Sequence, residues 1–234
     1  MIGRVGATRT VVTSAASPDR AAGGLLKILA GSVPAAIALV VALAPAAAHH
    51  VGTYSPRDNE ITTNFKQVKF SVQAKKFDVA LRLFERGALR AEMRAKARNL
   101  PPGLEAATRA ALQAGDVLEV ERQLMLFFAA LARELALEAD RQVANPKLSL
   151  AARTAAGQRF LEAIWRYYNL VDFAVSSRDS KASVAVRLAF DEAEGYVKSV
   201  SALGADKLRE PLRRIAQVLA DLIQTSSTSA RRNS

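Results

Sequence analysis

Apolar side chains recur along much of the chain at spacings of three, four and seven residues, which places them on one face of an α-helix. The first pattern spans about Asn59 to Lys96 and ends at residues 99–103, where two prolines prevent the helix from continuing. It has two apolar rows, one at Ile61, Phe65, Val68, Val72, Val79 and Leu83 and the other at Phe70, Phe77 and Phe84. Because two rows make a wide apolar face, this helix is expected to contact more than one neighbour.

Further helical patterns follow, separated by short polar or proline-containing breaks. Asp116 is well placed to cap the longest central helix, with Glu119 three positions later. The patterns predict helices over residues 105–114, 117–144, 149–175, 181–204 and 208–224. The central helix carries an apolar row at Val117, Val120, Leu124, Phe127, Phe128, Leu131 and Leu135.

Long helices joined by short connections fold back on one another. The sequence therefore predicts an all-α fold, an up-and-down antiparallel bundle of four to five helices that follows an amino-terminal export signal. The bundle domain is predicted to span residues 59–224, and the Ser/Thr/Arg-rich residues 225–234 are predicted to be a disordered tail.

The first 48 residues are predicted to be a targeting peptide that is removed on export. An uncharged apolar run from Ile28 to Pro45 follows four basic residues and one acid, and three alanines after it provide a small-residue cleavage site ending at Ala48. Cleavage there leaves residues 49–58 as a polar amino-terminal segment. The destination is the periplasm or, if the long leader is an organelle transit sequence, an organelle lumen. The alternative is an uncleaved membrane anchor through residues 28–47, since roughly 20 apolar residues span a bilayer.

Composition narrows the chemistry that the chain can perform. Cysteine is absent, which excludes disulfides, thiolate metal sites and cysteine nucleophiles. The net charge is +11, and it becomes +8 if cleavage leaves 29 Lys and Arg against 21 Asp and Glu. These cations are scattered among acids and form no stripe, so nucleic acid is not the expected partner. We expect an acidic protein or a membrane-associated complex, with contact to a membrane surface as a further possibility.

His49 and His50 are the two histidines of the chain, and cleavage after Ala48 would make them the first residues of the mature protein. A terminal amine and an imidazole nitrogen together suit copper(II), which prefers nitrogen ligands in a planar arrangement. A copper site is therefore one hypothesis, and a polar pair that merely follows the cleavage site is the other. No histidine follows residue 50, which argues against the Glu-x-x-His pairs of di-iron bundles.

Trp165, Tyr168 and Asp172 share one face of a predicted helix and suggest a strip that binds a protein partner. The alternative is that the two aromatic side chains fill the core and satisfy their polar atoms internally. Acidic residues elsewhere lie beside arginines, which favours a solvated, salt-linked surface over acid–base catalysis.

Residues 166–223 have a characteristic order of elements. A Tyr-rich helix end is followed by a polar break at residues 178–181, a helix with Phe190, Asp191, Glu192 and Ala193, a short link and a closing helix at residues 215–220. This order resembles the PsbQ-type extrinsic subunits of photosystem II. The resemblance implies a basic, lumenal four-helix bundle without catalytic residues.

Signatures of serine hydrolases, phosphate-binding loops and zinc sites are missing from the sequence. The expected function is therefore a non-enzymatic one. The chain is predicted to be an accessory or scaffolding subunit of a periplasmic or lumenal assembly. A copper-binding protein and a PsbQ-like photosystem subunit are the alternatives.

Overall fold

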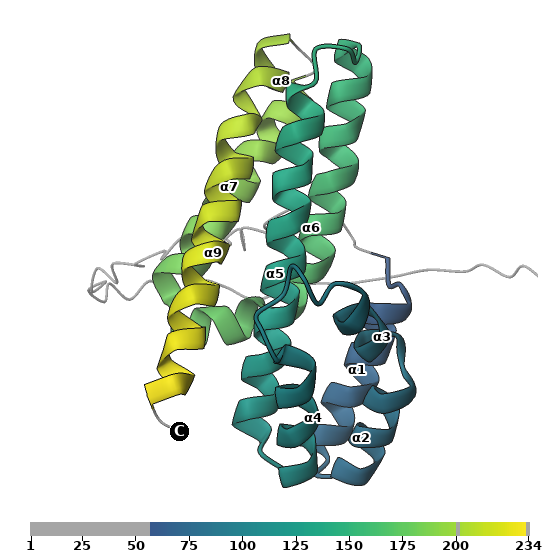
Figure 1. Ribbon diagram of the computed structural model, residues 1–234. Helices are drawn as coiled ribbons and strands as arrows, with labels where there is room; N and C mark the ends of the chain where they lie inside the picture. The colour runs from purple at the N-terminus through teal and green to yellow at the C-terminus, as the bar shows by residue number, and fades with distance from the viewer. Residues whose placement is uncertain (1–56, 200–201, 233–234) are drawn as a thin grey trace, which may run out of the picture. The chain divides into compact units, whose positions relative to one another are not determined.

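The computed structural model describes residues 57–199 and 202–232, which form the helices labelled in Figure 1. The all-α class predicted from the sequence is confirmed for these ranges, where all regular structure is helical. The helices are α1 (Glu60–Gln73), α2 (Phe77–Arg86), α3 (Ala88–Ala95), α4 (Leu104–Ala114), α5 (Val117–Ala144), α6 (Leu150–Arg178), α7 (Ser180–Lys198), α8 (Ala202–Lys207) and α9 (Arg209–Arg232). The predicted targeting peptide, the anchor alternative at 28–47 and the polar segment through residue 56 lie outside the described residues.

Four long helices, α5, α6, α7 and α9, make up what we call the long-helix group. Within it α5 packs against α6, α6 against α7, α7 against α9, and α9 again against α5. Each helix runs opposite to the one before it in the chain (Figure 1). This closed arrangement places the inner face of every helix against two neighbours, so their apolar rows share one core.

The stretch of α5 from residue 123 to residue 132 is buried on all sides. Every residue from 123 to 132 is buried, including the large Phe127 and Phe128. A helix with a single apolar face would leave its other side in water, so this stretch needs neighbours all round. Helix α4 and the Phe65 ring of α1 cover the side that α6 and α9 leave open, with the centres of the Phe65 and Phe128 rings 4.8 Å apart.

The prediction of one long helix over residues 59–96 is wrong, because the helix is interrupted twice within this range. The first break follows α1, where Lys75 has a left-handed backbone with φ of 56°. The second is at Gly87, whose backbone is extended between α2 and α3. Apolar spacing alone continues across both breaks, so it gave no sign of them.

Asn64 of α1 holds the second break in place. Its Oδ1 accepts a hydrogen bond from the Leu89 N–H at 3.0 Å, and its Nδ2 donates to the Leu83 carbonyl at 3.1 Å. These backbone groups at the end of α2 and the start of α3 would otherwise lack helical partners. A Cβ at position 87 would lie 2.0 Å from the Asn64 Oδ1, so the contact requires glycine there.

The remaining helices lie close to their predicted positions, apart from two differences near the carboxyl terminus. The segment predicted as one helix over 181–204 ends at Lys198, and the short α8 follows. Helix α9 continues to Arg232, past the residue where a disordered tail was predicted to begin. The Thr225 hydroxyl donates to the Asp221 carbonyl, and Arg122 of α5 donates to the Ser226 carbonyl at 3.2 Å. Neither contact is visible in apolar periodicity.

Replacing Asn64 with alanine is expected to lower the free energy of unfolding by about 1–3 kcal/mol, because two largely buried backbone groups lose their partners. Urea denaturation followed by the helical circular dichroism signal measures this change. Gln67→Ala, at an exposed position of the same helix, is the matched control and is expected to change the value by less than about 0.5 kcal/mol. Equal effects of the two substitutions would contradict the role assigned to Asn64.

Candidate interaction surface

A groove opens on the surface where α1, the start of α5 and the end of α6 meet. It encloses about 270 Å³. Its apolar lining comes from all three helices and includes Phe65, Leu118, Leu124, Leu170, Val171 and Phe173. Phe65, Leu124 and Val171 are buried and form the floor, whereas Phe173 is 83% exposed and Leu118 is 72% exposed. The groove therefore combines a fixed apolar floor with large apolar side chains that remain in contact with water.

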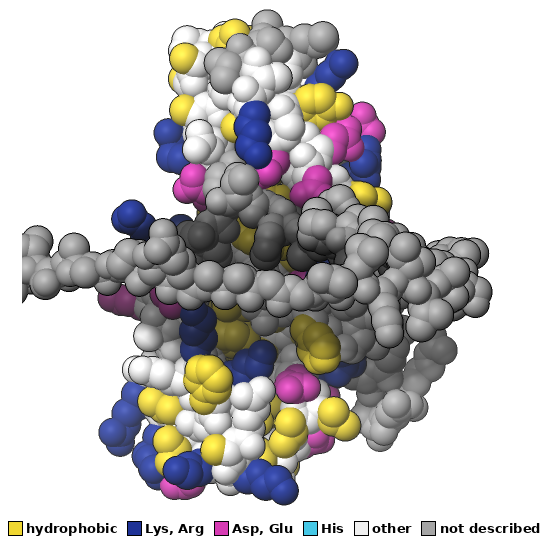
Figure 2. All heavy atoms as spheres, turned by 180° about the vertical axis from the view of Figure 1, so that it is seen from behind, with side chains coloured by type: hydrophobic (Ala, Val, Ile, Leu, Met, Phe, Trp, Pro, Cys, Tyr) yellow, Lys and Arg dark blue, Asp and Glu magenta, His cyan; other side chains and the backbone are white. Residues whose placement is uncertain are grey.

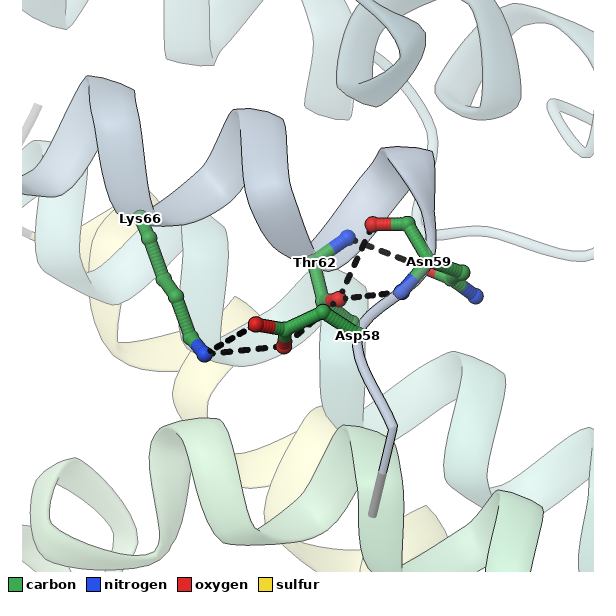
Figure 3. Close-up of polar contacts among 4 residues, drawn as sticks. All are labelled: Asp58, Asn59, Thr62 and Lys66. Atoms are coloured by element: carbon green, nitrogen blue, oxygen red, sulfur yellow. Dashed lines mark hydrogen bonds and ion pairs between the residues drawn. The ribbon is translucent and has the colours of Figure 1, made fainter. Parts of the chain in front are cut away.

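The wall formed by α1 is fixed by polar contacts at the start of that helix. The Asn59 side chain accepts from the Thr62 N–H at 2.9 Å, and the Thr62 hydroxyl accepts from the Asn59 N–H at 2.8 Å (Figure 3). The Asn59 Nδ2 also donates to the Tyr167 hydroxyl of α6 at 3.1 Å. This capping arrangement joins the first turn of α1 to α6, next to the groove.

An ion pair supports the same turn. The Lys66 ammonium lies 2.7 Å from an Asp58 carboxylate oxygen (Figure 3). The hydrogen bond from Lys66 lowers the pKa of Asp58 below its ordinary value. Asp58 and Lys66 are both well exposed, so the pair contributes little to stability and mainly restrains the geometry of the turn.

The charged residues at the groove are mostly basic. Lys69 of α1 and Arg178 of α6 line it, together with one acid, Glu121 of α5. The Lys69 ammonium lies 5.8 Å from the centre of the Phe65 ring. Lys69 and Arg178 form no direct ion pair with the described residues, although Arg178 lies near enough to Glu119, which is paired with Arg122, to help lower the pKa of that carboxyl. Figure 2 shows apolar side chains gathered among Lys and Arg over the lower part of the face opposite that of Figure 1.

The predicted strip of Trp165, Tyr168 and Asp172 is buried between α6 and α7. The Trp165 ring centre lies 4.9 Å from that of Phe190 and 6.2 Å from that of Tyr168. In this fold Trp165 and Tyr168 belong to the hydrophobic core, as the first part of the alternative given above expects. A partner would reach them only if α6 and α7 separated, so partner binding by this strip remains an untested prediction.

Asp172 joins α6 to α7 through polar contacts. One of its oxygens accepts from the Ser183 hydroxyl at 3.0 Å, and both accept from the Arg187 guanidinium. The adjacent Tyr168 hydroxyl is buried close to Ser183 and Asp172 but makes no well-formed hydrogen bond with either. Burial, together with the negative charge of Asp172, raises the pKa of Tyr168 well above its ordinary value. This tyrosine therefore stays protonated at any ordinary pH.

A second, wider cleft of about 660 Å³ lies between α3, the loop after it and the middle of α5. Its lining is polar, and several of its charges neutralise one another: Lys96 pairs with Glu134, and Arg141 pairs with Glu138. Hydrogen bonds from Gln142 and Arg141 lower the pKa of Glu138. A general acid at neutral pH needs a raised pKa, so the arrangement at Glu138 is the opposite of catalytic tuning.

Asp140 also behaves as a structural ion. Burial opposes its ionisation, but hydrogen bonds from Arg209 and Arg213 of α9 outweigh burial and lower its pKa. Two acids of α7 also form ion pairs: Glu192 pairs with Arg214, and Glu194 pairs with Lys198. These contacts agree with the salt-linked surface expected from the sequence.

His49 and His50 lie outside the described residues, so the copper hypothesis stays a prediction. Within residues 57–199 and 202–232, no three His, Cys, Asp or Glu side chains gather closely enough to hold a metal ion. None of the helices in those ranges has both the length and the apolar character needed to cross a membrane.

Comparisons of the chain with protein-family models, with curated proteins and with solved structures found no match. The resemblance of residues 166–223 to PsbQ-type subunits therefore rests on the order of its elements and stays a prediction.

The groove was not predicted from the sequence, although two apolar residues outside the predicted buried faces indicate it. Leu118 lies next to the predicted apolar row of the central helix but does not belong to it, and Phe173 directly follows Asp172 of the predicted strip without sharing its face. An apolar side chain off the buried face of a helix either meets a further neighbour or remains in water. Here both side chains remain exposed, and helix α1 brings a third wall beside them.

Replacing Tyr168 with phenylalanine is expected to leave the free energy of unfolding unchanged or to raise it by up to about 1 kcal/mol, because the buried hydroxyl that is removed makes no well-formed hydrogen bond. Asp172→Ala is expected to lower it by about 1–3 kcal/mol. That loss is smaller than for a fully buried pair because Arg187 is 42% exposed and water replaces part of the contact. Urea denaturation compares the two variants, and a larger loss for Tyr168→Phe would contradict this description.

Proposed function

We propose that this chain is exported, loses its first 48 residues and works as a non-enzymatic accessory or scaffolding subunit of a periplasmic or lumenal assembly. In this proposal the helices form an up-and-down antiparallel bundle that presents the groove between α1, α5 and α6 to a protein partner. The observation that carries the proposal is the groove itself, with Phe173 and Leu118 exposed over a buried apolar floor.

Protein recognition suits this groove better than small-molecule binding does. Small-molecule sites usually enclose roughly 300–1,000 Å³ and bury most of their ligand, whereas this cavity is about 270 Å³ and open. It has room for one large side chain of a partner. Interface energy is often concentrated in such anchors, with an aromatic or aliphatic side chain seated in an apolar pocket.

The non-enzymatic part of the proposal is supported by how the acids are used. Asp140, Asp172 and Glu138 are each held by arginine, and the pKa values of Asp140 and Glu138 are lowered. Perturbed pKa values mark catalytic groups when they move toward the working pH. These shifts move away from it, which is the pattern of structural ion pairs.

A photo-crosslinking amino acid at position 173 is expected to give a discrete adduct with a second protein when the full chain is produced in its native cells. The same group at position 70 is the matched control, because Phe70 is also an exposed phenylalanine, at 66%, and does not line the groove. Gel electrophoresis and mass spectrometry identify the adduct. Equal adducts at both positions, or none at 173, would count against the groove as the binding surface.

Amino-terminal sequencing of the protein recovered from native cells is expected to begin at His49. The reason is that the three alanines ending at Ala48 offer a cleavage site after an uncharged run. Recovery of a chain that still contains residues 28–45 in the membrane fraction would contradict export by cleavage and favour the anchor.

A further inference from the structure

We infer that the occupant of the groove is an amphipathic helix of a partner protein, with acidic residues beside its apolar stripe. This inference rests on the proposed function, because it names the chemistry of the partner at the same groove. It follows from the shape of the groove, from the charges on its rim and from the charge of the chain as a whole.

The shape favours a helix as the bound element. The walls are helices α1, α5 and α6, whose backbone groups are hydrogen-bonded within each helix. An extended peptide gains affinity by adding to the free edge of a sheet, and the described residues form helices and no sheet. A helix lying in an apolar groove presents side chains at three- and four-residue spacing, and one of them fills a cavity of this size.

The rim charges favour acidic residues on that helix. Lys69 and Arg178 lie on two different walls and form no direct ion pair with the described residues, and Glu121 is the one acid of the lining. Glu119 lies close enough to feel the charge of Arg178, but it is already paired with Arg122. Carboxylates on the flanks of a bound helix would meet both cations. Rim pairs of this kind improve selectivity and association rate more than they improve affinity, and two of them are worth roughly tenfold at low salt.

Two other occupants fit the observations less well. A second copy of this chain would bring Lys69 and Arg178 together with the same cations of its partner, on a protein whose net charge after cleavage is still +8, from 29 Lys and Arg against 21 Asp and Glu. An anionic bilayer would satisfy the charges, but it has no side chain to enter a cavity beneath Phe173 and Leu118. Both remain outcomes that the experiment can detect.

The test uses two fluorescent 18-residue model peptides with the same leucine stripe, one with glutamate and one with lysine on its flanks. Binding to the purified chain is measured by anisotropy at about 50 mM salt. The glutamate peptide is expected to bind roughly tenfold more tightly, and Phe173→Glu is expected to abolish this binding while Phe70→Glu leaves it unchanged. Failure of the glutamate peptide to bind, or equal binding of both peptides, would overturn the inference.

Charge variants separate the groove from the general basicity of the chain. Lys69→Glu with Arg178→Glu is expected to remove or reverse the preference for the glutamate peptide. The matched control is Lys147→Glu with Lys207→Glu, which makes the same charge change at exposed positions that do not line the groove. An equal loss of preference in both double variants would show that net charge, not the groove, selects the peptide, and would overturn the inference.

Two further measurements show whether a membrane or a second copy of the chain occupies the groove instead. If the chain sediments with phosphatidylglycerol vesicles and Phe173→Glu removes this binding, the occupant of the groove is a membrane. If the chain self-associates at high concentration and Phe173→Glu prevents it, the occupant is a second copy. A protein adduct at position 173 combined with no preference between the peptides would leave the proposed function standing and remove only the acidic helix. The absence of that adduct would remove the proposed function as well.

Discussion

The rest of this structure depends on the burial of one stretch of helix α5, residues 123–132, on all its sides. Over residues 123–132 every side chain is buried, so the helix cannot exist in this form without neighbours around its whole circumference. Each large side chain taken fully out of water contributes about 1.5–3 kcal/mol, and two phenylalanines stand side by side here. Small side chains provide the room: Ala129, Ala130 and Ala132 let neighbouring backbones approach closely.

This constraint explains why the amino-terminal helices are present at all. Helices α6 and α9 cover one side of α5, and α1 and α4 complete the enclosure through contacts such as the Phe65 and Phe128 rings. The groove arises where this enclosure ends, at the first turns of α5. Polar contacts then hold the α1 wall against α6, with the Asn59 side chain donating to the Tyr167 hydroxyl. A fixed surface binds with less loss of conformational freedom than a flexible one.

Features with a period of three or four residues could be predicted from the sequence, and features that depend on a distant partner could not. The row from Val117 to Leu135 predicted α5 correctly, because its spacing reports one buried face directly. The break at Gly87 was missed because its cause is an asparagine 23 residues earlier that reaches it only after folding. The Trp165 strip was placed correctly on one face, but spacing does not distinguish a face that meets a partner from a face that meets α7. The exposure of Phe173 could not be predicted either, because it depends on which neighbouring helices cover that part of α6.

Charge is used in two different ways in this molecule. Within the long-helix group, arginines pair with acids between helices, as Asp172 does with Arg187 and Asp140 with Arg209, and these ions restrain how the helices pack. At the groove, Lys69 and Arg178 form no direct ion pair with the described residues, and Arg178 acts on Glu119 only through its nearby charge. These two cations thus lie beside the exposed apolar side chains of the groove.

Native-state hydrogen exchange across a urea series tests most directly whether α5 couples the amino-terminal helices to the long-helix group. Amides of residues 123–132 are expected to exchange only through global unfolding, and those of residues 65–72 and 104–112 are expected to follow the same urea dependence. Exchange of the amino-terminal helices through a separate opening that leaves α5 fully protected would contradict this coupling and the fixed groove that depends on it.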